Sequence, residues 1–412
     1  MNDDTSKPAP AASHHFGRKL LNVVPMLIVF SFGLVVGMTS NANFPKIYLP
    51  FVPPWPSPML SSQPPVPPPT LPPPTLPPPP PPLMAPPPPS PPSNPQMELT
   101  SFLAPPSGVM HNMTDEELFW RASMVPQVRR TPYHRVPKVA FLFMTTGDLP
   151  LRPLWEMFFA GQNASLYSIY VHTSPSYNGS SPVDSVFYGR TIPSQITRWG
   201  DITLVDAERR LLANALLDLG NERFALLSDT AIPVYNFSAV YALLTGADTS
   251  FVDSFVNHDS DVRYNPFFER CCNITLPRWR KGFEWFEMDR ALAVAVVSDA
   301  DYYPSFRQYC ARRRCCLMDE HYIPTLLSVV GWRRNANRTV TYEDWRRRGS
   351  HPRTHYGRDV TEALIREIRA GAGQNCTYNG KPADICYVFA RKFAPDTVEP
   401  LLALAPKLMG FG

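Results

Sequence analysis

The sequence predicts an α/β fold with a largely parallel sheet, formed as a single domain that follows a membrane helix and a proline-rich stalk. Short apolar runs alternate with helix-length segments in the second part of the chain, which is the pattern of a parallel sheet covered by helices. An uncharged apolar run stands near the N-terminus, and many of the 50 prolines follow it. The 412 residues therefore divide into a segment that cannot pack a core and a compact domain.

Residues 20–38 form the predicted membrane helix. The run LLNVVPMLIVFSFGLVVGM carries no formal charge, and at ~1.5 Å per residue it spans about the ~30 Å hydrocarbon core of a bilayer. Arg18 and Lys19 precede it, whereas the first basic residue after it is Lys46, so the positive-inside rule keeps residues 1–19 in the cytosol and the rest in the lumen. The alternative is a cleaved signal peptide, whose apolar core is usually only ~7–15 residues long.

Residues 39–96 form the predicted stalk. The run PPVPPPTLPPPTLPPPPPPLMAPPPPSPP lacks backbone donors, so it should adopt polyproline II rather than helix or sheet. At ~3.1 Å per residue, about fifty residues would reach on the order of 150 Å. The alternatives are a ligand for proline-reading domains, which are mostly cytosolic, and a cell-wall-like O-glycosylated segment. Residues 97–137 are predicted as a helical stem, because Thr114 opens a Thr-Asp-Glu-Glu capping signal before an apolar stretch.

The folded domain is predicted to occupy residues 138–412 and to begin with a βαβ unit. Apolar runs at 139–146 and 166–173 flank a helix that contains WEMFFAG. A third run at 223–230 follows the amphipathic helix LVDAERRLLANALLDLG, and SFVDSF at 250–255 is a further short strand. Ligands of such sheets bind beyond the carboxyl ends of the strands.

Composition indicates the secretory pathway and gives no case for nucleic acid as a partner. The formal charge is only +4, from 39 Lys and Arg against 35 Asp and Glu. Seven cysteines between Cys271 and Cys386 lack the Cys-x-x-Cys spacing of zinc sites, and they predict structural disulfides with at least one thiol left over. Seven glycosylation sequons favour the same oxidising compartment, at Asn112, Asn163, Asn178, Asn236, Asn273, Asn337 and Asn375.

The ends of the predicted strands supply a polar rim. Thr145, His172 and Asp229 stand at or near the carboxyl ends of the first three strands, where a nucleotide would bind. His172 fits a structural role equally well. The chain contains neither GxGxxG nor GxxxxGK[ST], which argues against a dinucleotide fold and a phosphate-loop ATPase.

Two Asp-x-Asp strings are candidates for a metal site, because such a pair after an apolar strand commonly holds the divalent metal of a nucleotide-sugar transferase. Asp299-Ala-Asp301, however, follows FEMDRALAVAVVSD, whose apolar residues suit a helix face, so these carboxylates are predicted at the surface of a helix end. Asp259-Ser-Asp261 is predicted to lie in a loop. The sequence therefore predicts neither a metal ligand set nor a cofactor.

A group of proton-transferring side chains stands before a predicted apolar helix at 318–331. Asp319, Glu320 and His321 lie at its front, where the positive end of the helix dipole favours acidic groups. Helix capping alone explains one carboxylate. Transfer to a sugar hydroxyl also needs a carboxylate as general base, so the triplet is a candidate for catalysis.

Two basic groups lie towards the C-terminus. Arg366 and Arg369 end a predicted helix, and Arg391 and Lys392 follow the short run CYVF. A solvated basic face explains them without a function. In a metal-free transferase, however, cations must neutralise a leaving diphosphate, and Arg and Lys suit this role.

From about Lys138 to Gly412 the chain resembles the plant branch of the Core-2/I-branching β-1,6-N-acetylglucosaminyltransferase family, which includes the brittle-culm-type proteins. The matching strings are, in order, KVAFLFMTTGDLPLRPLWEMFF, LYSIYVHTSPSY, VDAERRLLANALLD, LLSDTAIPVYNF, WRKGFEWFEMDRALA, MDEHYIPT and CYVFARKF. The resemblance implies a GT-A-like, Rossmann-like catalytic domain, a UDP-sugar donor, inversion at the anomeric carbon and no obligatory metal.

The resemblance also implies roles for individual residues. Glu320 takes the position of the catalytic base, and Lys392 takes that of a ligand to the UDP phosphates. Arg369 matches the accompanying arginine by its spacing ahead of this lysine, with Arg366 as the alternative. The strand end that carries His172 corresponds to the uridine-binding segment.

For the acceptor, the resemblance implies a wall that passes Gly282, Glu284 and Trp285, without indicating which acceptor. The implied protein is a Golgi-type, single-pass type II glycosyltransferase that moves GlcNAc or glucuronic acid to a cell-wall polysaccharide or arabinogalactan-type glycoprotein. A non-catalytic lumenal scaffold is the rival hypothesis, against which the retained Glu320, Arg369 and Lys392 count. A glycosidase usually needs two opposed carboxylates, and the sequence singles out one.

Overall fold

The computed structural model describes residues 108–126, 135–311, 313, 315–347 and 349–411. The predicted anchor at 20–38 and the predicted stalk at 39–96 lie outside these residues. Among the helices that are described, none is both long enough and apolar enough to cross a bilayer.

A four-stranded sheet forms the centre of the domain. Its strands lie in the order β2-β1-β3-β5, and β1 is parallel to both of its neighbours, whereas β5 is antiparallel to β3. The bounds are Lys138–Met144 for β1, Tyr167–His172 for β2, Asn221–Ser228 for β3 and Glu287–Asp289 for β5. The predicted α/β fold with a largely parallel sheet is therefore confirmed.

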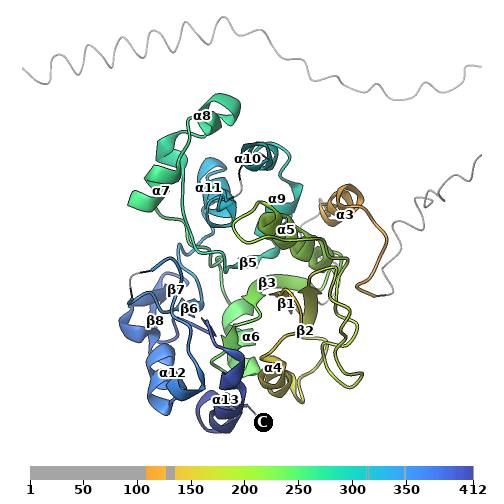
Figure 1. Cartoon of the computed structure of the whole chain (residues 1–412), viewed down its shortest axis with the longest axis vertical. Helices are drawn as coiled ribbons and strands as arrows, with labels where there is room; N and C mark the ends of the chain where they lie inside the picture. The colour runs from red at the N-terminus through yellow and green to blue at the C-terminus, as the bar shows by residue number, and fades with distance from the viewer. Residues whose placement is uncertain (1–107, 127–134, 312, 314, 348, 412) are drawn as a thin grey trace, which may run out of the picture. The chain divides into compact units, whose positions relative to one another are not determined.

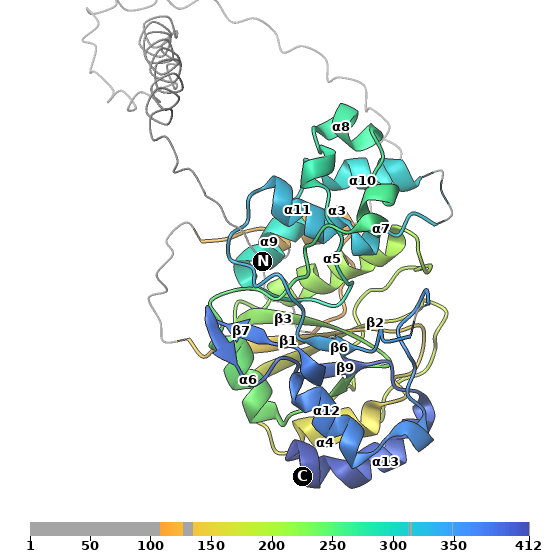
Figure 2. The ribbon, with the colours of Figure 1, turned by 90° about the vertical axis from the view of Figure 1, so that its left-hand side faces the viewer.

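Helices cover both faces of this sheet, as Figures 1 and 2 show. The pleat of β1 sorts its side chains, so that Phe141 and Phe143 face one core and Ala140 and Leu142 face the other. The first core is closed by α4 (Arg152–Phe159), α6 (Phe237–Thr245), α12 (Glu362–Arg369) and α13 (Val398–Leu404). The second is closed by α3 (Asp115–Ala122), α5 (Thr203–Leu216), α9 (Arg290–Ser298), α10 (Tyr303–Cys310) and α11 (Tyr322–Val329).

The helix predicted in the stem is α3, and it packs on α5 of the domain. The Thr114 side chain and Glu117 form the capping box that the sequence predicts. Arg210 on the buried α5 donates two hydrogen bonds of 2.7 Å to the carboxylate of Asp115. This bidentate ion pair ties the segment before β1 to the centre of the fold.

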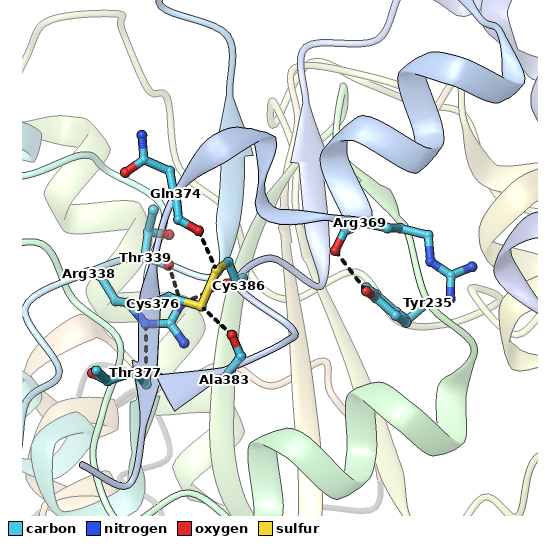
Figure 3. Close-up of a disulfide and its surroundings, with 9 residues drawn as sticks. All are labelled: Tyr235, Arg338, Thr339, Arg369, Gln374, Cys376, Thr377, Ala383 and Cys386. Atoms are coloured by element: carbon cyan, nitrogen blue, oxygen red, sulfur yellow. Dashed lines mark hydrogen bonds between the residues drawn. A yellow bond between two sulfur atoms is a disulfide. The ribbon is translucent and has the colours of Figure 1, made fainter. Parts of the chain in front are cut away.

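A second, smaller sheet carries the C-terminal part of the chain back to the end of β3. In its order β4-β9-β6, the middle strand β9 (Phe389–Arg391) is antiparallel to β4 (Ile232–Pro233) and parallel to β6 (Thr341–Glu343). A hairpin of β7 (Cys376–Tyr378) and β8 (Lys381–Ala383) precedes β9 in the chain. The Cys376–Cys386 disulfide joins this hairpin to the segment just before β9 (Figure 3).

Cysteine pairing follows the expectation of structural disulfides with thiols left over. Cys310 pairs with Cys316, and Cys376 pairs with Cys386. Cys271, Cys272 and Cys315 are free thiols.

Three local predictions were wrong. Residues 250–255 were predicted as a strand, but they make only isolated bridges. The fourth strand of the central sheet is instead β5, which lies inside the run predicted as one helix. The helix begins only after β5, because Asp289 caps α9 by accepting from the Leu292 N–H at 2.8 Å. Asp259-Ser-Asp261 lies in α7 (His258–Arg263) and not in a loop. Asn257 begins that helix with a capping box to Ser260, and a further short helix, α8 (Phe267–Cys272), follows.

Candidate active site

Thr145 and His172, two residues predicted to line the edge of the sheet, are buried and bond to the backbone of neighbouring loops. The Thr145 hydroxyl is buried and bonds to the backbone of Gly147 and Asp148. His172 is fully buried, and its Nε2 accepts from the Gln195 N–H at 3.3 Å. Burial, and next the charge of Arg210, lower the pKa of His172 to about 4, so its ring is neutral at physiological pH. Neither side chain is open to a ligand in this conformation.

Arg391 is the most firmly held cation at the end of the sheet. Its Nε donates to the Ser228 hydroxyl at 3.1 Å, and its guanidinium pairs with Glu343 on β6. Trp285 is buried with its ring 4.1 Å from this guanidinium. The Trp285 ring therefore packs against a cation, and its place in the acceptor wall stays a prediction.

Lys392 follows directly and is partly open to solvent. Among the described residues, none accepts a hydrogen bond from its ammonium group. Burial, and next the charge of Arg391, lower the pKa of Lys392, while Glu343, Glu284 and Asp229 act in the opposite direction. Burial raises the pKa of Asp229, against the charges of Arg391 and Lys392. The Asp229 position predicted from the end of β3 thus faces the same pair of cations.

A cationic pocket of about 450 Å³ adjoins this lysine. Its lining residues are Arg347, His351, Arg353, Thr354, Tyr356, Arg358 and Asp359. The His355 N–H donates to the Lys392 carbonyl at 2.8 Å, which places the lining segment beside the strand end. Arg353 pairs with Asp359 at 3.0 Å. With three arginines and one carboxylate, the pocket presents positive charge next to Lys392.

Glu320 stands on the other side of the site, in a 3₁₀ turn at Met318–Glu320 immediately before α11. Arg263 on α7 and Lys281 both bind its Oε2, the lysine at 2.7 Å. Burial alone would raise the pKa of Glu320, but the hydrogen bonds and charges of Lys281 and Arg263 lower it below the ordinary value. Glu320 is therefore ionised at neutral pH, and its Oε1 has no hydrogen-bond partner within the described part of the chain.

The neighbours of Glu320 hold its loop in place. The Gly282 N–H donates to the Glu320 carbonyl at 2.9 Å, and a Cβ at Gly282 would collide with the backbone of Asp253, so only glycine allows this close approach. The buried His321 ring stacks on Trp279 and its Nδ1 lies 2.8 Å from the Arg280 carbonyl. Burial lowers the pKa of His321 to about 4, so it is a neutral anchor.

Glu284 connects the two sides electrostatically. Burial, and next the charge of Asp319, raise its pKa to about 8, and Arg391 and Lys392 are the cations that oppose this shift. Burial and the charge of Glu320 raise the pKa of Asp319 to about 6. The charge of Asp319 and the charges of Arg391 and Lys392 therefore all act on the Glu284 carboxyl group.

Sequence reasoning missed several residues of this site. Glu208 on α5 is only 1% exposed, and burial with the charges of Glu284 and Asp319 raises its pKa. Arg263, Lys281 and Arg353 were also missed. No local pattern marks them, because each reaches the site through contacts between distant segments.

The structure does not bring Arg369 into this cluster. Its guanidinium lies 4.2 Å from the ring centre of Tyr235, and it lines a separate pocket together with Arg366. Figure 3 shows Arg369 beside Tyr235, whose hydroxyl donates to the Arg369 carbonyl at 3.0 Å. Among the arginines of the pocket described above, Arg353 is two residues from His355, whose N–H donates to the Lys392 carbonyl.

Asp299 has a structural role in addition to its predicted place at a helix end. Its carboxylate accepts from the backbone N–H groups of Asp301, Tyr302 and Tyr303, at 2.9–3.1 Å, and thereby starts α10. Asp301 is exposed. Within the described residues, no group of three His, Cys, Asp or Glu side chains is arranged to hold a metal ion.

Comparison with known proteins shows the family of the chain. Residues 139–369 match the family model described as Branch: Core-2/I-Branching enzyme. The chain is 35% identical over 309 residues to glycosyltransferase BC10 of Oryza sativa subsp. japonica, across 65% of this chain and 76% of the rice protein. The chain therefore belongs to the Core-2/I-branching enzyme family of glycosyltransferases.

Proposed function

We propose that this protein is an inverting, metal-independent transferase with a GT-A-like catalytic domain, which moves a sugar from a UDP-sugar to a glycan hydroxyl. The observation that supports this most directly is the carboxylate of Glu320, which Arg263 and Lys281 bind through Oε2 while its Oε1 has no hydrogen-bond partner among the described residues. Glu284 links the turn of Glu320 to the cations at the end of β9, because the charges of Asp319, Arg391 and Lys392 all act on it.

Glu320 acts as the general base in this proposal. Its Oε1 takes the proton of the acceptor hydroxyl while the hydroxyl oxygen forms a bond to the anomeric carbon of the donor sugar. Arg263 and Lys281 fix the carboxylate through Oε2 and keep it ionised. A positioned base of this kind contributes roughly 10²–10⁴-fold to the chemical step.

The leaving group is UDP, which departs from the opposite face of the sugar and takes the electrons of the broken bond. Lys392 and the arginines of the adjoining pocket, Arg353 foremost, stabilise the charge that develops on the diphosphate. The sequence spacing assigns this role to Arg369 instead. The two assignments make opposite predictions for UDP affinity.

The donor proposed is UDP-GlcNAc or UDP-glucuronic acid, and the acceptor is a cell-wall polysaccharide or an arabinogalactan-type glycoprotein. The proposed setting is the Golgi lumen, with the chain held as a single-pass type II membrane protein by residues 20–38. This setting rests on the uncharged run, the flanking Arg18 and Lys19, and the sequons.

The proposal is tested by donor and acceptor screening with Glu320→Gln, which keeps the shape of the side chain and removes its basicity. UDP release and glycan product should fall by roughly 10²–10⁴-fold in kcat while UDP affinity stays near normal. The matched control is Glu399→Gln, at an exposed position on α13. Near-normal turnover of Glu320→Gln on the best acceptor would remove the base assignment.

The rival function is a non-catalytic lumenal scaffold. A scaffold would bind no UDP, and its Lys392→Met variant would behave as the unaltered chain does in every assay. Measurable UDP binding that depends on Lys392 therefore separates the two.

A further inference from the structure

A second pocket of about 740 Å³ lies apart from the residues of the proposed active site. It is formed by the start of α6, the end of α12 and the chain that follows α13, and its polar lining consists of Tyr235, Asn236, Arg366, Arg369 and Lys407. None of the residues grouped around Glu320 or Lys392 lines it. Its volume is that of a site for an oligosaccharide-sized ligand rather than for one small ion.

The charge of this pocket is strongly one-sided. Arg366 and Lys407 both pair with Glu362, at 2.6 and 2.8 Å, so two cations share one carboxylate. Arg369 has no carboxylate partner among the described residues. Three cations therefore face a space to which no acidic side chain contributes lining.

Arg369 is held ready by its surroundings. Its guanidinium lies over the Tyr235 ring, and the Tyr235 hydroxyl donates to the carbonyl of the same arginine, as Figure 3 shows. In neither contact does an N–H group of the guanidinium donate a hydrogen bond, so these groups can donate to a ligand. A planar fork that is already oriented loses less entropy when it binds a carboxylate.

Helix electrostatics accounts for only part of this arrangement. The dipole of α12 favours basic residues in its last turn, which suits Arg366 and Arg369. It does not explain why Lys407, from another element, faces the same space.

The pocket could also be filled by a glycan on the protein's own Asn236, which belongs to a sequon. However, the Asn236 side chain caps α6 by accepting from the Ala239 N–H at 2.9 Å, and its amide nitrogen lies close to Gly410. The cap engages only the side-chain oxygen, and the nitrogen to which a glycan would attach lies against the backbone at Gly410, which crowds a sugar there.

We propose that this pocket is a second, non-catalytic binding site for a carboxylated oligosaccharide, whose acidic groups pair with Arg369 and Lys407. The ligand is expected to be an anion because the charged side chains that line the pocket are all cations. The spacing of the cations on separate elements favours a ligand with several carboxylates over a single phosphate. The choice of a saccharide rests on the proposed transferase function, and such a site would hold an acidic stretch of a glycan while the enzyme acts elsewhere on it.

The test is calorimetric binding of an oligogalacturonide of about four residues to the purified lumenal part of the chain. A neutral cello-oligosaccharide of the same length and inorganic phosphate serve as comparison ligands. Lys407→Glu and the double variant Arg369→Gln with Lys407→Gln remove the pocket's charge. Arg270→Gln with Lys381→Gln removes two exposed charges elsewhere and is the matched control.

We expect the oligogalacturonide to bind, to weaken at least tenfold in both pocket variants, and to keep its affinity in the control. Transfer activity with a small neutral acceptor should be unchanged in Lys407→Glu, whose side chain is exposed. Equal binding by the pocket variants would overturn the proposal, as would equal binding of phosphate or of the neutral oligosaccharide.

Mass spectrometry that finds a glycan on Asn236 would also overturn it, because the protein's own glycan would then fill the space. UDP binding is measured on the same samples. If UDP binds normally and the oligogalacturonide does not, only this inference fails. If neither UDP nor a donor sugar binds, the proposed transferase function fails as well.

Discussion

UDP affinity should depend on Arg353 and not on Arg369. Replacing Arg353 by Met removes a charge-assisted contact to the diphosphate, worth on the order of 1.5–3 kcal/mol, which corresponds to roughly a ten- to hundredfold weaker Kd. The Arg353 side chain is 29% exposed, so we expect the lower part of this range. Without Arg353, the Asp359 carboxylate also loses its ion-pair partner near the pocket, so its negative charge repels the diphosphate more strongly.

The assay is calorimetric titration with UDP at fixed ionic strength, on Lys392→Met, Arg353→Met and Arg369→Met, with thermal melting as the check of folding. Arg353→Lys is the conservative control, because it keeps the charge and loses the fork geometry, and it should recover part of the affinity. If Arg369→Met weakens UDP tenfold while Arg353→Met binds normally, the sequence spacing is right and the structural assignment is refuted.

Three further outcomes follow from the contacts described. Lys281→Met removes a cation that lowers the pKa of Glu320, so the acid limb of the kcat/KM profile should move to higher pH; an unmoved limb would mean that another group titrates. Asp115→Asn breaks the bidentate pair of buried Arg210 and should lower the free energy of unfolding by about 1–3 kcal/mol, seen as a lower Tm without a change in kcat. Peptide mapping should find Asn236 unmodified, and a glycan there would show that α6 begins differently.

Much of the fold could be predicted because its signals are local. The strand β1 is apolar for almost its whole length, and β2 and β3 each contain a buried apolar stretch, as strands covered on both faces do. The stem helix was found from one capping box at Thr114. By contrast, β5 is only three residues long and leads directly into α9, so helical periodicity masked it.

The candidate site was predicted less completely, because its members meet through pairings between distant segments. The residue pattern marked Glu320 and Lys392 as candidates, and the family resemblance gave each its role. In the structure two cations bind Glu320, whereas both Arg391 and three carboxyl groups act on Lys392. The segment that contains Arg353 reaches Lys392 by backbone contacts at His355, which no spacing in the sequence reveals. The resemblance, applied through the spacing ahead of Lys392, selected Arg369, which lies at the end of α12 and lines a different pocket.

The place of β9 in the middle of the smaller sheet sets an order of assembly during biosynthesis. The strands β1, β2, β3 and β5 are all complete by Asp289, so the central sheet has its full set of strands while the rest of the chain is still being made. The strand β9, which carries Arg391 and leads into Lys392, is made close to the end of synthesis. It must then insert between β4 and β6, which are made earlier. Premature termination after Asp289 but before Arg391 would thus leave a chain with the strands of its main sheet but without Arg391 and Lys392. On the proposed mechanism such a fragment is inactive, which couples the onset of transfer to completion of the polypeptide.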